Sequence, residues 1–222
     1  MMKKICFILL LFLICPVATA TTLNFTGFIA DEADLLAPSV KNDLNMTLWD
    51  LQKKSGADIA VVTLPSLNGR KVEDVALEIG RSYKIGAIGK DNGVVFLTAV
   101  NEKRMRIELG TGLEKKISIK TLENIRDNDI LPYYREGDYN SGIARGTYIL
   151  AKTVADAEGV NLKTQGFCPP DKSNYDENFP LWVLIFGYFL SSLIPKKHFN
   201  TGSFGGFGGS GSFGGSGCSG KW

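Results

Sequence analysis

The residues best suited to chemistry in this sequence are acidic and amide side chains in glycine-containing loops. The segment GKDNGVVFL, residues 89–97, sets Asp91 and Asn92 between two glycines and leads directly into an apolar run. Asp and Asn beside Gly are standard turn residues, so one interpretation is a tight loop that enters a strand. The other is a ligand site, because loops at strand ends hold the sites of α/β sheets, and carboxylate and amide oxygens bind hard cations. The sequence leaves both interpretations open.

Three further segments place acidic residues near glycines or helix ends. FIADEADLL carries Asp31 and Asp34 ahead of a helix, where the dipole favours acids, and their spacing does not match an EF-hand loop. ELGTGLE carries Glu108 and Glu114 around two glycines that we expect to serve close backbone packing. NIRDNDILP carries Asp127 near a helix C-terminus, where an acid is slightly unfavourable. Each segment alone is a weak metal-binding candidate.

The distribution of histidine and cysteine limits the chemistry. The single histidine is His198, and the stretch 21–160 holds neither His nor Cys. This stretch therefore lacks a Ser-His-Asp triad, a Cys-His pair and an ordinary zinc site. Gly110 and Gly112 lack the third glycine of the dinucleotide motif and the Lys-Ser/Thr of a P-loop, so we expect no nucleotide. Carboxylates, amides, hydroxyls, Lys and Arg remain, which suit Ca²⁺ or Mg²⁺, and no catalytic residue is assigned.

The charge balance argues against nucleic acid as a partner. The chain has 25 Lys and Arg against 23 Asp and Glu. Removal of a leader that contains Lys3 and Lys4 leaves a neutral chain, and no basic stripe or Arg-rich helix stands out.

The elements that must position these residues form an α/β pattern across residues 21–160. Apolar periodicity, Pro38 near a helix start and Gly56 at its stop predict the first helix. Short runs rich in β-branched residues predict buried strands, and RMRIEL alternates with Arg106 and Glu108 outward. The predicted elements are helices at 38–56, 71–86, from Ser118 to before Pro132, and after a cap at Asp138 or Asn140, with strands at 58–65, 93–100 and 104–109. We expect a three-layer α/β/α sandwich around a small mixed sheet.

The flanking segments predict export and a membrane anchor. Residues 1–20 have the basic start, apolar core and A-x-A end of a signal peptide. After a polar linker at 161–179, residues 180–195 carry no charge, and Lys196-Lys197 fit the positive-inside rule. Leu181–Ile194 is short for a span, roughly 21 Å of helix against a hydrocarbon core of ~30 Å. We nevertheless expect one C-terminal transmembrane helix in a bacterial inner membrane, with the domain outside and a disordered Gly/Ser/Phe-rich tail, 196–222, in the cytoplasm.

Several of these segments resemble one known family in order and spacing. FIADEADLL, SGADIAVVTLPSLNG, IGKDNGVVFLTAVNEKRMRIELGTGLE and ILPYYREGDYNSGI are similar to the TPM domain family over about residues 25–157. GKDNGVVFL, RIELGTGLE and the run from Pro132 to Tyr139 are the most specific pieces. The leader, the apolar segment and the Gly/Ser-rich tail resemble the bacterial membrane-anchored members.

The resemblance implies a small α/β/α sandwich, and some members of the family bind a divalent cation, chiefly Ca²⁺, through acidic loop residues. We therefore expect Ca²⁺ ahead of Mg²⁺ here. Plant relatives in the thylakoid lumen support photosystem repair and have been credited with acid phosphatase activity. Carried over by motif, the implied metal ligands are Asp91, Asn92, Asp31, Glu114 and Asp127. Two positions depart from the family pattern, Ala37 in place of a capping Ser and Lys115 in place of a glycine after GLE.

Three functions stay open on this basis. The first is an exported cation-binding module that docks onto membrane or envelope proteins. The second is a metal-assisted phosphatase, which needs cationic groups near its ligands, and Lys90, Lys103 and Arg104 are near in sequence. The third is a purely structural envelope protein.

Overall fold

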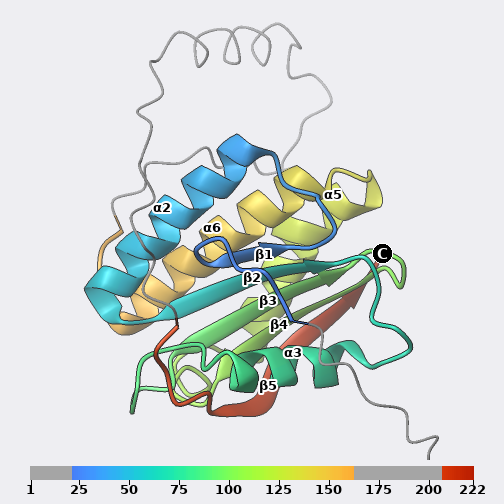
Figure 1. The fold of residues 1–222 in the computed structure, drawn as a ribbon. Helices are drawn as coiled ribbons and strands as arrows, with labels where there is room; N and C mark the ends of the chain where they lie inside the picture. The colour runs from blue at the N-terminus through green and yellow to red at the C-terminus, as the bar shows by residue number, and fades with distance from the viewer. Residues whose placement is uncertain (1–21, 163–206) are drawn as a thin grey trace, which may run out of the picture.

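The computed structural model describes residues 22–162 and 207–222, which form one mixed sheet between two helical layers (Figure 1). The sheet has five strands in the spatial order β1-β2-β3-β4-β5. The first three strands are parallel, and each of the last two is antiparallel to the strand before it. The strands are β1 (Ile29–Asp31), β2 (Asp58–Leu64), β3 (Gly93–Ala99), β4 (Arg104–Gly110) and β5 (Phe213–Lys221).

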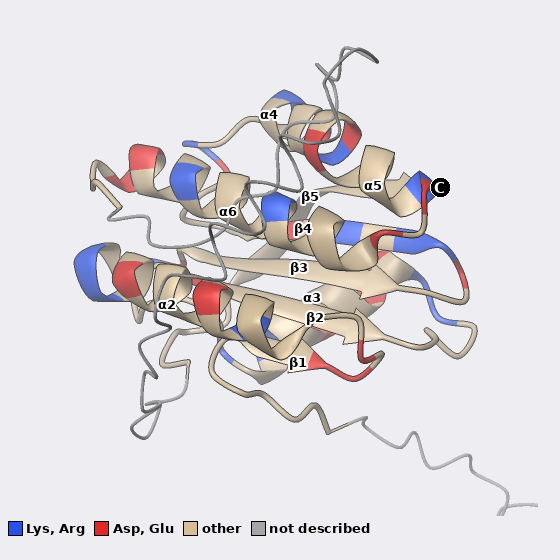
Figure 2. Ribbon diagram, turned by 90° about the horizontal axis from the view of Figure 1, so that it is seen from above, with Lys and Arg blue, Asp and Glu red and all other residues tan. Residues whose placement is uncertain are grey.

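Helices cover both faces of this sheet. Helix α3 (Val72–Ser82) lies on one face, and α2 (Pro38–Ser55) and α6 (Tyr139–Glu158) lie side by side on the other (Figure 1). The second layer is completed by α4 (Ile119–Asn124), a π-helical segment η1 (Ile125–Ile130) and α5 (Leu131–Arg135). Lys, Arg, Asp and Glu alternate along the outer helices, whereas the strands are largely uncharged (Figure 2). The predicted three-layer sandwich around a mixed sheet is confirmed.

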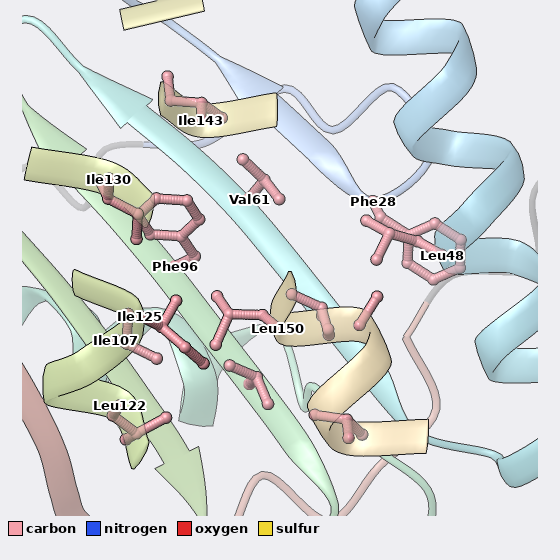
Figure 3. Packing of buried hydrophobic residues seen from close by; sticks show 14 of the residues in the cluster. Phe28, Leu48, Val61, Phe96, Ile107, Leu122, Ile125, Ile130, Ile143 and Leu150 are labelled. Atoms are coloured by element: carbon pink, nitrogen blue, oxygen red, sulfur yellow. The ribbon is translucent and has the colours of Figure 1, made fainter. Parts of the chain in front are cut away.

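Side chains that alternate along the central strands build two hydrophobic cores. On β2, Val61 enters the core beneath α2 and α6, and its neighbour Val62 enters the core beneath α3. Figure 3 shows the larger core, where Phe96 of β3 lies beside Ile130 and Leu150 approaches the sheet from α6. Both faces of β2 and β3 are therefore buried, as the continuous apolar runs of these strands predict.

Local signals account for the helix ends. Pro38 occupies the first turn of α2, and Gly56 ends the helix in the left-handed conformation at φ 77°, with its N–H donated to Gln52. Ser118 caps α4 and Asp138 caps α6, each by accepting a backbone N–H. Asn140 has a different role, because its Oδ1 accepts the N–H of Ala37, at 2.9 Å, just before α2.

The expectation that Arg106 and Glu108 point outward into solvent is wrong. Met105, Ile107 and Leu109 enter the larger core as predicted, but Arg106 is 7% exposed and Glu108 is 0% exposed. Alternation along β4 places both side chains on the second face of the sheet, where α3 packs, and β5 flanks them at the edge of the sheet. The Arg106 guanidinium donates two hydrogen bonds to Glu108 Oε2, at 2.8 and 2.6 Å.

The prediction of a disordered tail is wrong for residues 207–222. Phe213–Lys221 forms β5, which pairs antiparallel with β4 and closes one edge of the sheet (Figure 1). Residues 196–206 lie outside the described residues. Because β5 hydrogen-bonds directly to β4, the C-terminal segment belongs to the same folded unit as residues 22–162.

Two other expectations fall outside the described residues. The signal peptide, 1–20, and the apolar segment 180–195 are not covered by the structure. Within residues 22–162 and 207–222, no helix has the length and apolar character needed to cross a membrane.

Candidate functional site

The Asp91-Asn92 segment is a turn in which the Asp91 carboxylate contacts the C-terminal segment. Asn92 is buried, and its Oδ1 accepts the N–H of Ala87 at 3.0 Å, which closes the loop before β3. Asp91 has φ 50°, a left-handed conformation that Asp tolerates in turns. Its side chain is half-buried, and its Oδ1 accepts a hydrogen bond from the hydroxyl of Ser210 in the C-terminal segment. The turn interpretation therefore holds for Asn92, while the Asp91 carboxylate faces the C-terminal segment.

The Gly110–Glu114 loop lies directly against this turn. Gly112 donates its N–H to the carbonyl of Asp91 at 2.9 Å. A Cβ added to Gly110 would collide with the carbonyl oxygen of Asp91, and one added to Gly112 would collide with that of Lys90. The predicted role of these glycines in close backbone packing is confirmed. The contact brings Glu114 into the same loop cluster as Asp91.

Two glutamates in this cluster carry buried oxygens that have no hydrogen-bond partner among the described residues. These atoms are Oε1 of Glu114 and Oε1 of Glu108. The Glu114 atom faces the C-terminal segment, because a Cβ on Gly214 would lie 2.5 Å from it. Burial raises the pKa of Glu108 against the opposing effect of Arg106, and the charge of Glu114 raises that pKa further. An added cation would offset this concentration of negative charge.

Asp31 lies at the opposite end of the sheet. It pairs with Thr63 at the carboxyl end of β2, whereas Gly93, next to Asn92, pairs with Asp58 at the start of β2. Five residue steps of β2 separate the two levels, about 16 Å at the usual rise. Asp31 and Asp91 therefore do not share an ion.

The Asp31 carboxylate is also fully engaged. It accepts the N–H groups of Leu35 and Leu36 at 3.0 and 3.1 Å, the hydroxyl of Thr63 at 2.5 Å, and an ion pair from Lys41 at 2.7 Å. Burial alone would raise the pKa of Asp31, but Lys41 and these donors outweigh burial and hold that pKa below its usual value. This arrangement fixes the loop between β1 and α2.

Asp127 belongs to a third location. It lies exposed on η1, where Arg126 donates two hydrogen bonds to it at 2.7 and 2.8 Å and lowers its pKa. The same guanidinium donates to the carbonyl of Ser219 in β5 at 2.9 Å. Asp127 therefore orients an arginine that contacts β5, away from the Asp91 loop.

Sequence reasoning missed four residues of the loop cluster: Asp58, Thr111, Ser210 and Ser212. Thr111 donates its N–H to the carbonyl of Ser212, and their hydroxyls lie 3.1 Å apart. Asp58 accepts the Gly86 N–H at 3.1 Å and the Gln52 amide at 2.7 Å, which ties the Asp91 loop to α2, and burial raises its pKa. Asp58 at the head of a buried apolar run was a usable signal. Ser210 and Ser212 had none, because their segment was interpreted as disordered.

The cationic groups near this cluster are already engaged. Lys90 donates to the carbonyl of Ser55 at 2.9 Å, and Arg81 donates to that of Phe213 at 2.7 Å. Lys103, in the turn that follows β3, and Arg104, the first residue of β4, lie at the other end of the sheet. Among the described residues, no group of three or more His, Cys, Asp or Glu side chains is placed to hold a metal. A cation at Glu114 would therefore take most of its ligands from hydroxyls, carbonyls and water.

Comparison with known proteins gives a family and a fold. A family model described as TPM domain matches residues 29–153. The solution structure of the N-terminal domain of a protein from P. gingivalis is 27% identical, with a TM-score of 0.55 over 61% of this chain and 86% of that one. The BA42 protein of the psychrophilic bacterium Bizionia argentinensis is 19% identical, with a TM-score of 0.50 over 62% and 92%. No curated protein matches the chain.

Proposed function

Because this chain belongs to the TPM domain family, we propose that its folded domain is a non-catalytic module that binds a divalent cation and docks onto membrane or envelope proteins. Ca²⁺ is the preferred ion, because the available donors are carboxylate, hydroxyl and carbonyl oxygens in loops of irregular geometry. Glu114 is the central ligand, and Asp91 is the second.

The observation that carries this proposal is the buried Glu114 oxygen, which has no partner within residues 22–162 and 207–222. Buried carboxylate oxygens are normally hydrogen-bonded, and an unpaired one next to a second acid is unfavourable unless a cation neutralises it. Of the five ligands implied by the family motifs, Asp31 and Asp127 form ion pairs and the Asn92 oxygen accepts a backbone N–H. Among the described residues, the Asp91 carboxylate accepts only the Ser210 hydroxyl. Glu114 and Asp91 fit a hard cation.

A cation at this position would join the Gly110–Glu114 loop to the C-terminal segment. Asp91 contacts Ser210, and Glu114 faces Gly214, so both carboxylates lie along this segment. An ion that binds only the folded state at 100 times its Kd adds about 2.7 kcal/mol to the free energy of unfolding. We expect that gain to depend on β5 being in place.

Calorimetric titration of the purified protein with Ca²⁺ and then Mg²⁺ tests this proposal. The variants are Glu114→Gln and Asp91→Asn, and the matched control is Asp127→Asn, which removes an acid already neutralised by Arg126. We expect Ca²⁺ binding in the parent and the control, loss in Glu114→Gln and weakening in Asp91→Asn. Equal binding in all four proteins, or none in the parent, would remove the cation from the proposal.

A second candidate, a metal-assisted phosphatase, is favoured by one observation. The name of the matching family model contains the word phosphatase. The structure offers this activity little support near Glu114, because Lys90, Arg81 and Arg106 already donate to protein groups and are not free to bind phosphate. Hydrolysis of a phosphomonoester by the Ca²⁺- or Mg²⁺-loaded protein that disappears in Glu114→Gln would favour the phosphatase over the docking module.

The proposed location is the exported face of a bacterial inner membrane. The proposal rests on the leader at 1–20. A single crossing by the uncharged segment 180–195 would separate β5 from β4, so that segment is not proposed as a span. Cells that carry Gly208→Cys or Asp156→Cys in a Cys168→Ser background provide the test, with a thiol reagent that does not cross membranes. We expect both positions to be labelled from outside, since β5 keeps them in one compartment, and labelling of neither would place the domain inside.

A further inference from the structure

The strand β5 is built from residues that do not favour strands. Its nine residues, FGGSGCSGK, include four glycines and two serines, and Gly in a strand interior is normally destabilising. The segment nevertheless pairs with β4 from Arg104 to Gly110. Its position must therefore be determined by contacts specific to this site.

Individual glycines of β5 are required by close contacts or by a positive φ. A Cβ on Gly217 would collide with the carbonyl oxygen of Ile107, and one on Gly220 would lie 2.9 Å from the Arg126 side chain. Gly215 has φ 93°, which side-chain-bearing residues rarely adopt. A Cβ on Gly208, by contrast, would have no atom within 4 Å. The glycine-rich composition is thus a position-specific fit to β4 and its surroundings.

Aromatic residues fix both ends of this strand. Phe213 is buried where Gly80 and Gly93 leave space, because a Cβ on either would lie within 2.7 to 3.0 Å of its ring. At the other end, the Trp222 ring packs against Tyr134 with centroids 4.6 Å apart and donates to the Tyr139 hydroxyl at 3.2 Å. These two rings set the register of the segment between them.

Three arginines hold the backbone of the same segment. Arg81 donates to the carbonyl of Phe213 at 2.7 Å, Arg106 to that of Gly215 at 2.9 Å, and Arg126 to that of Ser219 at 2.9 Å. Guanidinium donors to main-chain carbonyls recognise an extended backbone rather than particular side chains. The β4 edge with these arginines, the space at Gly80 and the Tyr134 ring is called the tail groove below.

We propose that the tail groove is a peptide-binding site that recognises the segment FGGSGSFGGSGCSGKW, residues 207–222, and accepts it from a second copy of this chain as well as from its own. Strand addition at a sheet edge, with pockets for side chains at set positions, is an established mode of peptide recognition. The pairing of Phe213–Lys221 with β4 identifies the peptide that the tail groove binds as the C-terminal segment of this chain.

The length of chain between groove and ligand permits both arrangements. There are 44 residues, 163–206, between the two described parts of the chain. Binding of a segment to its own chain is intramolecular and does not depend on protein concentration, so the intramolecular form dominates in dilute solution. Exchange between copies becomes visible when the tether is cut or when the intact groove and the intact tail are on different chains.

The first experiment cuts the tether. A site-specific protease sequence is inserted within 163–206 of the full chain, the chain is cleaved, and a fluorescent peptide of residues 207–222 is added under reducing conditions. We expect uptake of label, and competition by unlabelled peptide that weakens at least 10-fold with Gly217→Ala but not with Gly208→Ala, the matched control. No uptake, or equal competition by both peptides, would show that β5 is a permanent strand.

The second experiment uses intact chains, so it does not depend on the stability of the cleaved protein. Gly217→Ala disables the tail and keeps the groove, and Gly80→Leu fills the space of the Phe213 ring and keeps the tail. We expect each variant alone to sediment as a monomer and an equimolar mixture to form a 1:1 dimer that excess 207–222 peptide dissociates. A mixture that stays monomeric at 100-fold the Kd of the peptide in the first experiment would overturn exchange between copies.

Discussion

Because Gly80 of α3 contacts Phe213 of β5, we predict that Gly80→Ala changes the free energy of unfolding in opposite directions in the presence and absence of the Phe213 ring. A Cβ added to Gly80 would lie 2.7 Å from two carbons of the Phe213 ring. Overpacking of this kind costs about 1–3 kcal/mol, while replacing Gly by Ala inside a helix contributes about 1 kcal/mol. We therefore expect Gly80→Ala to reduce the free energy of unfolding by about 1 kcal/mol.

The expected result reverses when Phe213 is already gone. Phe213→Ala alone removes a buried ring and costs about 3–5 kcal/mol, unless the C-terminal segment detaches first and limits the loss to its docking free energy. In that background the added Cβ meets no ring, so only the helix term remains. Gly80→Ala should then raise the free energy of unfolding by about 1 kcal/mol. The coupling between the two sites is about 2 kcal/mol.

Urea unfolding of the parent, the two single variants and the double variant measures this coupling directly. The slope of free energy against urea reports whether the C-terminal segment has detached, because a smaller buried surface lowers it. An effect of Gly80→Ala with the same sign and size in both backgrounds would refute the placement of the Phe213 ring against α3.

Three further predictions concern Asp31, Asp58 and Gly112. The pKa of Asp31 is lowered in the folded state, so its stabilising effect is present above the usual value near 3.8 and is lost as pH falls through the folded value. The free energy of unfolding, measured from pH 6 to pH 2, should therefore fall less steeply at low pH in Asp31→Asn than in the parent. Asp58 has a raised pKa, so its contribution is greatest at low pH and declines as pH rises past 3.8, and the difference between the parent and Asp58→Asn in the same titration should have the opposite slope. Gly112→Ala should lower the free energy of unfolding by about 3 kcal/mol in the urea assay, because its Cβ would collide with the Lys90 carbonyl. The control Gly69→Ala has a positive φ but open space, so it should cost about 1 kcal/mol. Equal costs would contradict the close approach of the two loops.

Much of the fold follows from local chemistry. Pro38 and Gly56 mark the ends of α2, and the apolar runs of β2 and β3 identify two strands buried on both faces. These signals depend on residues only a few positions apart, so the sequence alone is sufficient to predict them. The three-residue strand β1 was not predicted, because three residues are too few to show a period.

The misread elements depend on contacts across the chain. Alternation in β4 correctly separated Arg106 from Ile107, but only the positions of α3 and β5 decide that the Arg106 side is also buried. The glycines of β5 resemble a low-complexity sequence because the groups that require them, the β4 backbone and the Arg126 side chain, are more than 90 residues away in sequence.

The candidate ligands were separated for a similar reason. Asp31 and Asp91 both adjoin strands, and no spacing reveals that one follows β1 while the other precedes β3 in a parallel arrangement. Only strand direction places them at opposite ends of the sheet. The close approach of Gly112 to Lys90, in contrast, follows the expectation for a paired-glycine loop.

The late position of β5 in the sequence has a consequence for synthesis. There are 102 residues between Gly110, the end of β4, and Phe213, the start of β5. At roughly 5–20 residues per second, the ribosome needs on the order of 5–20 seconds to make them. During this interval the nascent domain presents an open strand edge, and Arg106 and Glu108 are exposed to water before the last strand covers them. A chaperone that shields β-edges would therefore meet this protein between the synthesis of its fourth and fifth strands, and chains that terminate early would keep that edge as a degradation signal.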